Sequence, residues 1–336
     1  MTNASLDRLL ATLVLAMAAT GLLTLWAGSP DAGWLFTVHD LLAGALAVAI
    51  GIKLRRSLPK AIGGRRWGRL AFALAVSFMA VVALTGGILW VGSGELLTVG
   101  SSTVLTLHAW AGLVLVPLVI LHLLPRRWRL LRPSVGGVRK LPDRLLSRRS
   151  LLAGGTLGLA SIALWGGASF VDRLRGGARR FTGSRWLPAG AVPPATTFFG
   201  EPTPSVDLAV WRVLIRGRVA GARSFSLAEL RALGETDHVA VLDCTSGWAI
   251  ETPWRGVPLS AVLSAAGVAD DAALVEVHSV TGWGASLSME EAHKCVLATG
   301  VAGGDLPLAN GAPCRLVVPD RRGLDWVKWV ADVVVT

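Results

Sequence analysis

Two kinds of side chain in this sequence are suited to redox chemistry at a metal: histidines inside apolar segments and one cysteine outside them. His39 and His108 each lie five residues after the start of a long apolar segment. Cys244 lies in the C-terminal third, directly before the stretch Thr245-Ser246-Gly247. Imidazole nitrogens ligate haem iron, and a thiolate is a soft donor for a heavy metal. The sequence therefore predicts two different metal sites in two different environments.

The remaining cysteines and histidines predict no further metal site. There is no C-x-x-C pair for zinc and no C-x-x-C-H for covalent haem attachment. Cys295 and Cys314 either pair in an oxidising compartment or stay as buried thiols, and a lone cysteine such as Cys244 can also be a small buried hydrophobe. Three histidines lack ligand spacing and are expected in core or surface roles: His238, His278 and His293.

The composition requires that part of the chain lies in lipid. Of 336 residues, 52% are hydrophobic and only 16% are charged, which is too apolar for one soluble domain. A bilayer core of about 30 Å takes roughly 20 helical residues. Five segments meet this length without the periodic polar stripe of a soluble bundle: 9–27, 34–52, 70–91, 103–124 and 151–171. We predict five membrane-spanning helices.

The formal net charge of +11 does not indicate a nucleic-acid partner, because the basic residues cluster at the ends of the apolar segments. They concentrate in 53–69 and 126–149, whereas 28–33 and 92–102 hold none. Since Lys and Arg are retained on the cytoplasmic side, the N-terminus is predicted to be cytoplasmic and the C-terminal region extracytoplasmic. The chain is thus expected to be a multi-pass protein of the cell membrane, surrounded by lipid.

The fifth apolar segment follows a pair of arginines, Arg148 and Arg149, within the stretch S-R-R-S-L-L. This stretch resembles a twin-arginine export signal, which serves proteins that fold around their cofactor before transport. The alternative is that the two arginines only obey the positive-inside rule. No small-x-small cleavage site follows, so the segment is predicted to remain as a membrane anchor.

The orientation places His39 and His108 at the same depth, near the outer face. Two imidazoles on facing helices are what a six-coordinate haem iron requires, and a membrane histidine is a functional candidate by default. We predict one outer b-type haem on this pair; the alternative is a hydrogen bond across a helix interface. The small residues beside the pair, such as Gly44 and Gly112, fit either reading.

A pseudo-repeat extends the pattern. Fourteen residues after His39 stands Lys53, and fourteen after His108 stands His122, a spacing of about 21 Å along the same helix face. The pattern resembles membrane b-type cytochromes that stack two haems across the bilayer. Lys53 takes the place of the fourth histidine, so a second haem iron at His122 is possible but less favoured than an interfacial histidine near a quinone or lipid headgroups.

The region after the fifth segment changes character. Residues 173–205 are rich in Arg, Gly and Pro and predict a tether. From 206 on, β-like runs (209–215, 238–242, 273–278, 315–318, 332–335) mix with helical stretches (227–233, 259–265). The expected organisation is a four-helix cytochrome b domain at 1–130, a basic loop and fifth helix at 131–172, a linker at 173–205 and a mixed α+β domain at 206–336.

Two blocks of this last domain resemble the molybdopterin domain of the sulfite oxidase family. The first is L-D-C-T-S-G-W at 242–248 with W-R-G-V-P-L at 254–259. The resemblance implies that Cys244, at the end of a strand, is the only protein ligand to molybdenum, with Thr245 beside it at the cofactor. A thiolate suits such a metal chemically.

The second block is G-A-P-C-R-L-V-V-P at 311–319, followed by V-K-W at 327–329. In the family, basic side chains near these stretches hold the phosphate of the pterin. The resemblance implies Arg322 and Lys328 as phosphate donors, because a terminal phosphate needs cations in a fixed cradle. Arg321 could instead be a surface charge.

The departures from the family bear on the substrate. Sulfite oxidases use arginines after the cysteine and a tyrosine to hold the oxyanion, whereas this sequence has Thr245-Ser246-Gly247 there and no tyrosine at all. It is more similar to bacterial members that reduce S-oxides, among them the periplasmic methionine sulfoxide reductase, whose catalytic subunit works with a haem-bearing membrane partner.

The sequence therefore predicts a membrane-bound molybdopterin-dependent oxidoreductase that passes electrons between the quinone pool, a b-type haem and an extracytoplasmic molybdenum centre, and that reduces an S- or N-oxide. One alternative is a sulfite-type dehydrogenase that delivers electrons from a small sulfur substrate to the membrane. Others are a non-catalytic interaction domain on a cytochrome anchor, and a helical bundle that serves only as an anchor.

Overall fold

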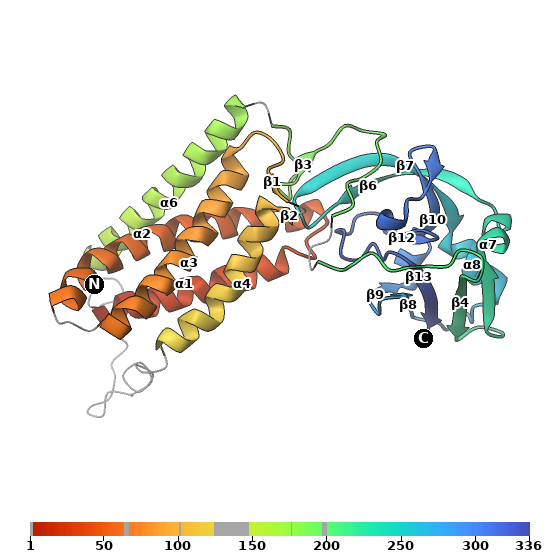
Figure 1. The fold of residues 1–336 in the computed structure, drawn as a ribbon, viewed down its shortest axis with the longest axis horizontal. Helices are drawn as coiled ribbons and strands as arrows, with labels where there is room; N and C mark the ends of the chain where they lie inside the picture. The colour runs from red at the N-terminus through yellow and green to blue at the C-terminus, as the bar shows by residue number, and fades with distance from the viewer. Residues whose placement is uncertain (1–2, 64–66, 101, 124–147, 176, 197–199) are drawn as a thin grey trace. The chain divides into compact units, whose positions relative to one another are not determined.

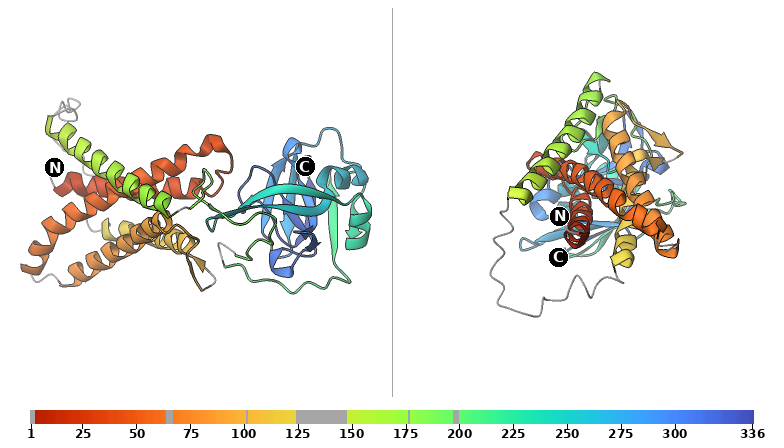
Figure 2. Two further views of the ribbon diagram at one scale, coloured as in Figure 1. Left: turned by 90° about the horizontal axis from the view of Figure 1, so that it is seen from above. Right: turned by 90° about the vertical axis from the view of Figure 1, so that its left-hand side faces the viewer.

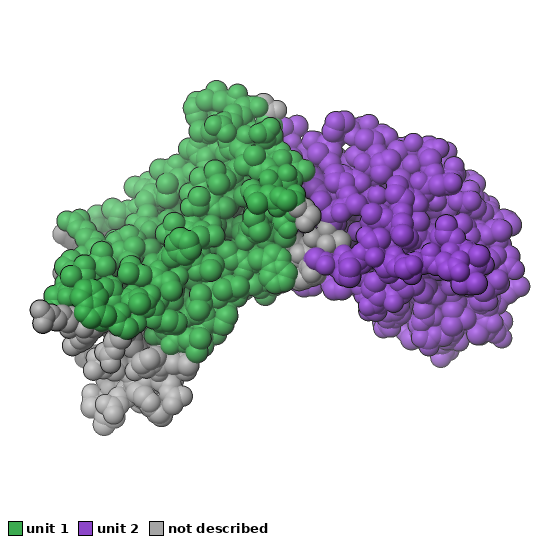
Figure 3. Space-filling model, viewed as in Figure 1, with its two compact units in different colours: residues 1–24, 33–177 green, residues 25–32, 178–336 purple. Residues whose placement is uncertain are grey.

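A computed structural model describes the chain except for residues 1–2, 64–66, 101, 124–147, 176 and 197–199. The described residues form two compact units, one of residues 1–24 and 33–177 and one of residues 25–32 and 178–336 (Figure 3). The first unit is helical and the second contains the β-sheets (Figure 1).

The helical unit consists of long apolar helices, as predicted: α1 (Asn3–Leu23), α2 (Trp34–Gly63), α3 (Trp67–Gly92), α4 (Val104–Leu123) and α6 (Arg148–Leu174), with a short hairpin of β1 (Thr98–Val99) and β2 (Ser102–Thr103) before α4. Among the described residues, five helices are long and apolar enough to cross a membrane. Helix α2 continues beyond the expected end at Ile52, because the basic stretch that follows consists largely of good helix formers. Figure 2 shows the five helices from two further directions.

Apolar side chains of this unit both pack inward and face outward. Leu6, Leu46 and Ala49 are fully or nearly fully buried in a cluster between α1 and α2. On the outer surface, Phe78 and Leu152 are 67% and 70% exposed. An exposed apolar surface of this kind suits lipid rather than water. The five helices therefore indicate a membrane protein.

The second unit contains two β-sheets and confirms the predicted mixed α+β domain. The first sheet has the order β11-β10-β7-β3, with β12 paired to β10 and β6 paired to β7. Its strands are β3 (Arg185–Trp186), β6 (Thr236–Asp243), β7 (Trp248–Pro258), β10 (Val296–Val301), β11 (Gly304–Asp305) and β12 (Arg315–Val317). Strands β6 and β7 form the long curved pair in Figure 1.

The other sheet has the order β5-β4-β13-β8-β9, formed by β4 (Arg212–Gly217), β5 (Arg223–Ser226), β8 (Leu274–Ser279), β9 (Gly284–Ser288) and β13 (Val330–Val335). The helices are α7 (Leu227–Ala232), α8 (Leu259–Ala266) and α9 (Met289–Ala292). Alternate residues of β4 and β8, such as Val213, Ile215, Val275 and Val277, are fully buried. This period-two burial is the pattern of strands with one face on the core.

All five predicted β-like runs overlap strands, and both helical stretches overlap α7 and α8, although residues 209–211 of the first run precede β4. The prediction missed β7, because Pro253, Gly256 and Pro258 lie inside it and such residues normally argue against a strand. Gly256 has a specific reason to be there: a Cβ at that position would lie 2.5 Å from the carbonyl oxygen of Leu297. Close approach of β10 therefore requires glycine.

The segment expected to be a tether is partly a packed element. Arg185 and Trp186 pair in parallel with Trp248 and Ala249 of β7, and further on the Gly190 amide donates to the carbonyl of Glu251 at 2.8 Å. The sequence did not predict the short strand in this segment, because turn residues surround it and its partner strand β7 is distant in sequence. This segment therefore packs against the sheet that carries the β6–β7 turn.

Candidate functional site

Cys244 sits in a tight turn between β6 and β7. Its amide donates to the Trp248 carbonyl at 2.8 Å, and the Gly247 amide donates to the Cys244 carbonyl at 2.9 Å. Gly247 has a φ of 94°, a left-handed conformation that favours glycine. The turn leaves the thiol partly exposed, as a ligand must be.

The thiol lies on the wall of a cavity of about 320 Å³ in the second unit, a size suited to a small-molecule or cofactor site. The lining combines apolar rings, hydroxyls and two cations: Pro194, Thr196, Glu201, Leu242, Cys244, Thr245, Trp248, Thr281, Gly282, Trp283, Arg315, Gly323, Leu324, Trp326 and Lys328. The structure thus brings the predicted residues Cys244, Thr245 and Lys328 together.

Arg315 is the cation that sequence analysis did not single out. Its side chain is 4% exposed, and its guanidinium lies 5.5 Å from the Trp254 ring centroid and 5.8 Å from that of Trp326. Nη1 donates to the Asn310 carbonyl at 3.0 Å, but Nε has no hydrogen-bond partner among the described residues. Burial lowers the pKa of Arg315 to about 10, so it remains charged at neutral pH. A buried cation that forms no ion pair with the described carboxylates is suited to bind an anion.

Lys328 is the second cation of the cavity. Its Nζ donates to the Ala309 carbonyl at 3.2 Å and lies 5.2 Å from the Trp329 ring centroid. Burial, with repulsion by Arg315, lowers the pKa of Lys328 to about 8. An anion in the cavity would favour the charged form of Lys328 and so oppose both causes of its lowered pKa. Two cations and one thiol in a single cavity fit a metal cofactor that carries a phosphate.

Arg322 takes another position. It is buried but is absent from the cavity lining. Its Nη2 donates to the Cys244 carbonyl at 3.1 Å and lies 3.4 Å from a carboxylate oxygen of Asp243. The geometry therefore favours Arg315 over Arg322 as the anion-binding arginine, and Arg322 supports the turn of the thiol. Its neighbour Arg321 forms ion pairs with Glu291 and Asp325.

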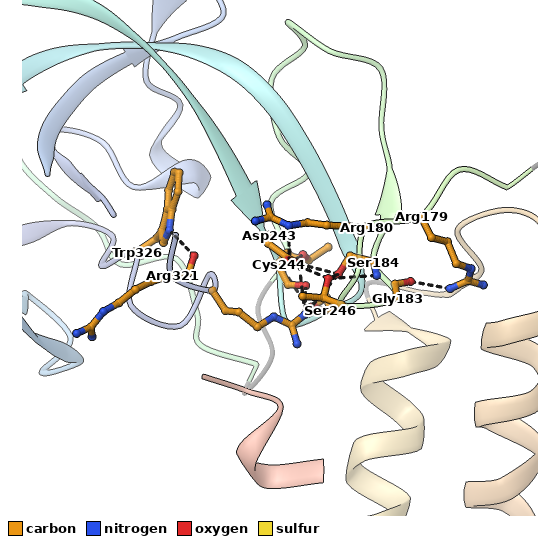
Figure 4. A network of polar contacts seen from close by, with 12 residues as sticks. Arg179, Arg180, Gly183, Ser184, Asp243, Cys244, Ser246, Arg321 and Trp326 are labelled. Atoms are coloured by element: carbon orange, nitrogen blue, oxygen red, sulfur yellow. Dashed lines mark hydrogen bonds and ion pairs between the residues drawn. The ribbon is translucent and has the colours of Figure 1, made fainter. Parts of the chain in front are cut away.

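Asp243 links the turn to the segment once expected as a tether (Figure 4). This carboxylate is 1% exposed and accepts hydrogen bonds from Thr182 Oγ1 at 2.8 Å and Ser184 Oγ at 2.6 Å. Arg180 Nε lies 3.4 Å away. Because a buried carboxylate needs such partners, residues 180–184 are part of the support of Cys244.

The other cysteines and histidines lie outside this cavity lining. Cys295 and Cys314 are unpaired and buried, and burial raises the pKa of the Cys295 thiol to about 12. His238 contacts Thr236 Oγ1 at 2.8 Å. Within the described part of the chain there is no group of three or more His, Cys, Asp or Glu side chains that could hold a metal ion, so metal binding at Cys244 would use a cofactor's own ligands.

In the helical unit, the predicted histidine pair meets. The ring centroids of His39 and His108 are 6.0 Å apart, with an interplanar angle of 85°. His108 Nδ1 donates to the Ala83 carbonyl at 2.7 Å. Thr20 Oγ1 donates to the Ala16 carbonyl and lies 2.9 Å from His39 Nδ1, so that Nδ1 acts as the donor. With Nδ1 as the donor in both rings, Nε2 is the unprotonated nitrogen, which is the form that a metal ion requires.

Glycines of neighbouring helices make room for the two rings. A Cβ at Gly21 would lie 3.2 Å from His39 Cε1, and one at Gly87 would lie 3.4 Å from His108 Cε1. Gly44 instead allows α2 and α6 to pack closely, because a Cβ at Gly44 would lie 2.6 Å from Ser161 Cα of α6. Gly112 has no atom of this kind within 4 Å.

The end of the bundle that carries Lys53 and His122 differs from the end that carries the histidine pair. Lys53 forms an ion pair with Asp7 of α1. The His122 ring stacks on Phe72 of α3, with centroids 5.9 Å apart and an interplanar angle of 18°. The described residues at this end therefore offer one histidine, not a facing pair.

Comparison with known proteins defines the class of the second unit. Residues 200–336 match the family described as oxidoreductase molybdopterin binding domain. This match supports a molybdopterin-binding oxidoreductase domain in this part of the chain, in agreement with a cavity that contains one thiol and two cations.

Several other proteins are similar to parts of this chain. The protein-methionine-sulfoxide reductase catalytic subunit of Xanthomonas campestris is 31% identical over 38% of this chain and 46% of its own length. That of Pseudomonas syringae is 28% identical, covering 60% of this chain and 76% of the relative. A putative protein-methionine-sulfoxide reductase subunit of Azospira oryzae, YedZ1, is 29% identical over 43% of this chain and 56% of its length.

The matches differ in how much of the chain they cover. The chain spans less than half the length of the Xanthomonas relative. The Pseudomonas match covers 60% of the chain, whereas residues 200–336 are 137 of 336 residues, about 41%. That match therefore includes residues before 200, where the structure places part of the support of Cys244.

Proposed function

We propose that this protein is a membrane-bound molybdopterin-dependent oxidoreductase that reduces an S-oxide with electrons from quinol, passed through a b-type haem in the helical unit. The observation that carries the proposal is one cavity that contains the Cys244 thiol and the buried Arg315, which forms no ion pair with any described carboxylate. The domain family and the names of the relatives favour methionine sulfoxide as the substrate.

The residues of the cavity have separate tasks in this proposal. Cys244 ligates the molybdenum, while Arg315 and Lys328 neutralise the cofactor phosphate. When bound, the cofactor supplies two-electron oxygen-atom transfer, and the protein supplies positioning and electrostatics. The hydrogen bonds of Asp243 and Arg322 hold the turn of the thiol. The tryptophans of the lining, such as Trp283, offer apolar surface to the carbon substituents of a sulfoxide and exclude water.

The lining also favours a neutral oxide over sulfite. Among the described lining residues, Arg315 and Lys328 are the cations, and both are assigned to the cofactor. The turn after Cys244 contributes Thr245 rather than an arginine, and the sequence has no tyrosine. A doubly charged oxyanion would lack dedicated donors, whereas a sulfoxide needs little more than one hydrogen bond to its oxygen.

The histidine pair fits a haem in its geometry. The ring centroids of His39 and His108 are 6.0 Å apart, and the two imidazoles would hold one haem iron between them. The Nδ1 hydrogen bonds of His39 and His108 fix both rings in the ligating tautomer. We propose one haem b at this pair, and an ion pair rather than a second haem at Lys53.

The proposed topology follows the basic stretches at 53–69 and 126–149, with the N-terminus cytoplasmic and the C-terminal domain extracytoplasmic. Arg148 and Arg149 begin α6 and are proposed as part of an export signal; Ser147 and the preceding loop lie outside the described residues. The proposed domain organisation keeps the four-helix cytochrome domain at 1–130, and residues 178–196 join the molybdopterin domain that follows.

One experiment tests the proposal directly. The full-length protein is purified, its haem and molybdenum are quantified, the haem is reduced anaerobically with a quinol analogue, and methionine sulfoxide is added. We expect stoichiometric molybdenum and rapid haem reoxidation, and no reoxidation in Cys244→Ala. Haem without molybdenum would overturn the enzymatic proposal. Reoxidation that persists in Cys244→Ala would place the chemistry elsewhere, and haem reduction by sulfite would favour the dehydrogenase alternative.

A further inference from the structure

A threonine upstream of the family match lies beside the thiol. Thr196 Oγ1 is 3.6 Å from Cys244 Sγ and 3.0 Å from Trp248 Nε1. The match to the molybdopterin family begins at residue 200, and sequence analysis assigned this segment to a tether. Neither the family match nor the sequence pattern therefore assigns a role to Thr196.

The direction of the bond to Trp248 follows from chemistry, and that of the contact with Cys244 follows once the sulfur is a thiolate or a metal ligand, which cannot donate. An indole Nε1–H can only donate, so Thr196 Oγ1 accepts from Trp248. The hydroxyl hydrogen of Thr196 is then available for a second acceptor, and Cys244 Sγ lies within range for a hydrogen bond to sulfur. Trp248 is 1% exposed and fixed in β7, so it holds the hydroxyl in one orientation.

The backbone that carries Thr196 is also fixed. Asn310 Nδ2 donates to the Pro193 carbonyl at 2.8 Å, and Thr252 Oγ1 donates to the Ala191 carbonyl at 3.0 Å. The amide of Thr196 itself donates to the Pro194 carbonyl at 2.9 Å. Because these anchors come from two other parts of the domain, the hydroxyl is in place before any cofactor binds, which is what preorganisation of a metal site requires.

The sulfur has a second donor, the backbone amide of Ser246 at 3.4 Å. Hydrogen bonds to a ligating sulfur draw electron density from it and so tune the potential of the metal. We propose that Thr196, oriented by Trp248, is a positioning residue that donates a hydrogen bond to the sulfur of Cys244 and thereby sets the electron-donor strength of the proposed molybdenum ligand. This inference rests on the proposed function.

The test compares Thr196→Val, which keeps the shape but removes the hydroxyl, with Thr196→Ser, which keeps the hydroxyl. The first readout is the rate of alkylation of Cys244 at neutral pH in the full-length protein produced without molybdate. Cys295 and Cys314 are 1% and 0% exposed and do not interfere. Since the thiolate is the reacting form, we expect alkylation to slow about fivefold in Thr196→Val and to stay within about twofold in Thr196→Ser.

The second readout is the electron paramagnetic resonance signal of molybdenum in the loaded protein. We expect this signal to shift in Thr196→Val at unchanged molybdenum content, and to return in Thr196→Ser. Trp248→Phe, which removes the orienting donor, is expected to give an intermediate effect on both readouts. Molybdenum content and the thermal melting curve verify that each variant is folded.

Two failures are distinguishable. Wild-type protein that binds no molybdenum would overturn the proposed function, while the alkylation rates would still judge the hydrogen bond to the sulfur. Equal alkylation rates in wild type and Thr196→Val, with an unchanged molybdenum signal, would overturn the role of Thr196. If Thr196→Val does not fold, Thr196→Ala replaces it, with the same expected slowing.

Discussion

The two candidate sites of this molecule are built in different ways. The histidine pair of the helical unit needs two residues on two regular helices, and each ring is held by one hydrogen bond to a third group. The cavity of the C-terminal domain gathers side chains from Pro194, Thr196 and Glu201 and from stretches within 242–248, 281–283 and 315–328. The buried carboxylate of Asp243 supports the turn that carries the thiol. The first site depends on helical regularity, and the second depends on the fold of a whole domain.

This difference predicts different responses to substitution. Loss of a histidine should remove the haem and leave the helices folded, because lipid and apolar packing stabilise the bundle. Loss of a buried polar group beneath the thiol should instead cost stability, because its partners stay buried and unsatisfied.

Replacement of the thiol should have the largest effect. In Cys244→Ser we expect molybdenum-dependent sulfoxide reduction to fall by at least about 10³-fold, because a hydroxyl is a poor ligand for a soft metal. Haem content should stay at the wild-type level. Turnover with quinol and haem content, measured on the same samples, check this. Concurrent loss of the haem would show that the two sites are not independent.

The histidine pair gives the reciprocal case. His39→Ala and His108→Ala should each lose the haem absorption spectrum and lower quinol-driven turnover by about 100-fold or more, while molybdenum content is retained. His122→Ala is the matched control at the inner end of the bundle and should keep the full haem content. A fall to half in that control would indicate a second haem and contradict the single-haem proposal.

These two sites also differ in how far the sequence predicts them. His39 and His108 could be paired because the rise of a helix is regular, so equal positions in two spans give equal depth. Their partners Thr20 and Ala83 could not, since these depend on how each helix is rotated against its neighbours. Five helices and seven elements of the C-terminal domain followed from hydropathy and alternation, whereas the proline-containing strand β7 did not.

In the cavity, Cys244 followed from a local motif, but the choice among nearby arginines did not. Arg315 lies on the regular strand β12, whereas Arg322 lies in an irregular loop, after Asp320 with its φ of 64°. No periodicity indicates which side chain of such a loop faces the cavity. Thr196 was missed for a related reason, because the stretch that positions it pairs with residues more than fifty positions away.

Arg315 and Arg322 should respond differently to substitution, because only Arg315 lines the cavity and only Arg322 contacts Asp243. Arg315→Met should reduce cofactor occupancy about 10- to 100-fold and leave the fold intact, because it removes a buried charge that has no acidic partner. Arg322→Met should act mainly on stability, since it leaves Asp243 buried with one cation fewer. Molybdenum content and thermal melting separate the two. Equal cofactor loss at equal stability in both variants would restore Arg322 as a phosphate donor.

The hydroxyls beneath the turn should give a smaller effect. Ser184→Ala and Thr182→Ala each remove one hydrogen bond to the buried Asp243 and should lower the free energy of unfolding by about 1–3 kcal/mol. Ser205→Ala, at an exposed position of the same chain, is the control and should stay within about 0.5 kcal/mol. Unfolding of the C-terminal domain, followed by tryptophan fluorescence, provides the measurement. Unchanged stability in both variants would return residues 180–184 to the role of a tether.

The smallest effect concerns Lys328 and pH. Its folded pKa of about 8 lies below the ordinary 10.5 because burial disfavours the charged form. Between these values the unfolded chain binds more protons than the folded chain, so the cofactor-free protein should gain stability as the pH rises from about 8 to about 10.5, by up to about 1 kcal/mol per pH unit. Below pH 8 Lys328 should contribute no slope.

Lys328→Met should remove this slope, so the difference between wild type and variant isolates the lysine from other titrating groups. In the loaded protein, a phosphate beside Lys328 would raise its folded pKa toward the ordinary value. The slope above pH 8 should then flatten in wild type as well, which ties the lysine to an anion without any measurement of activity. A slope that persists unchanged after cofactor loading would place the phosphate away from Lys328 and leave Arg315 as the cation that binds it.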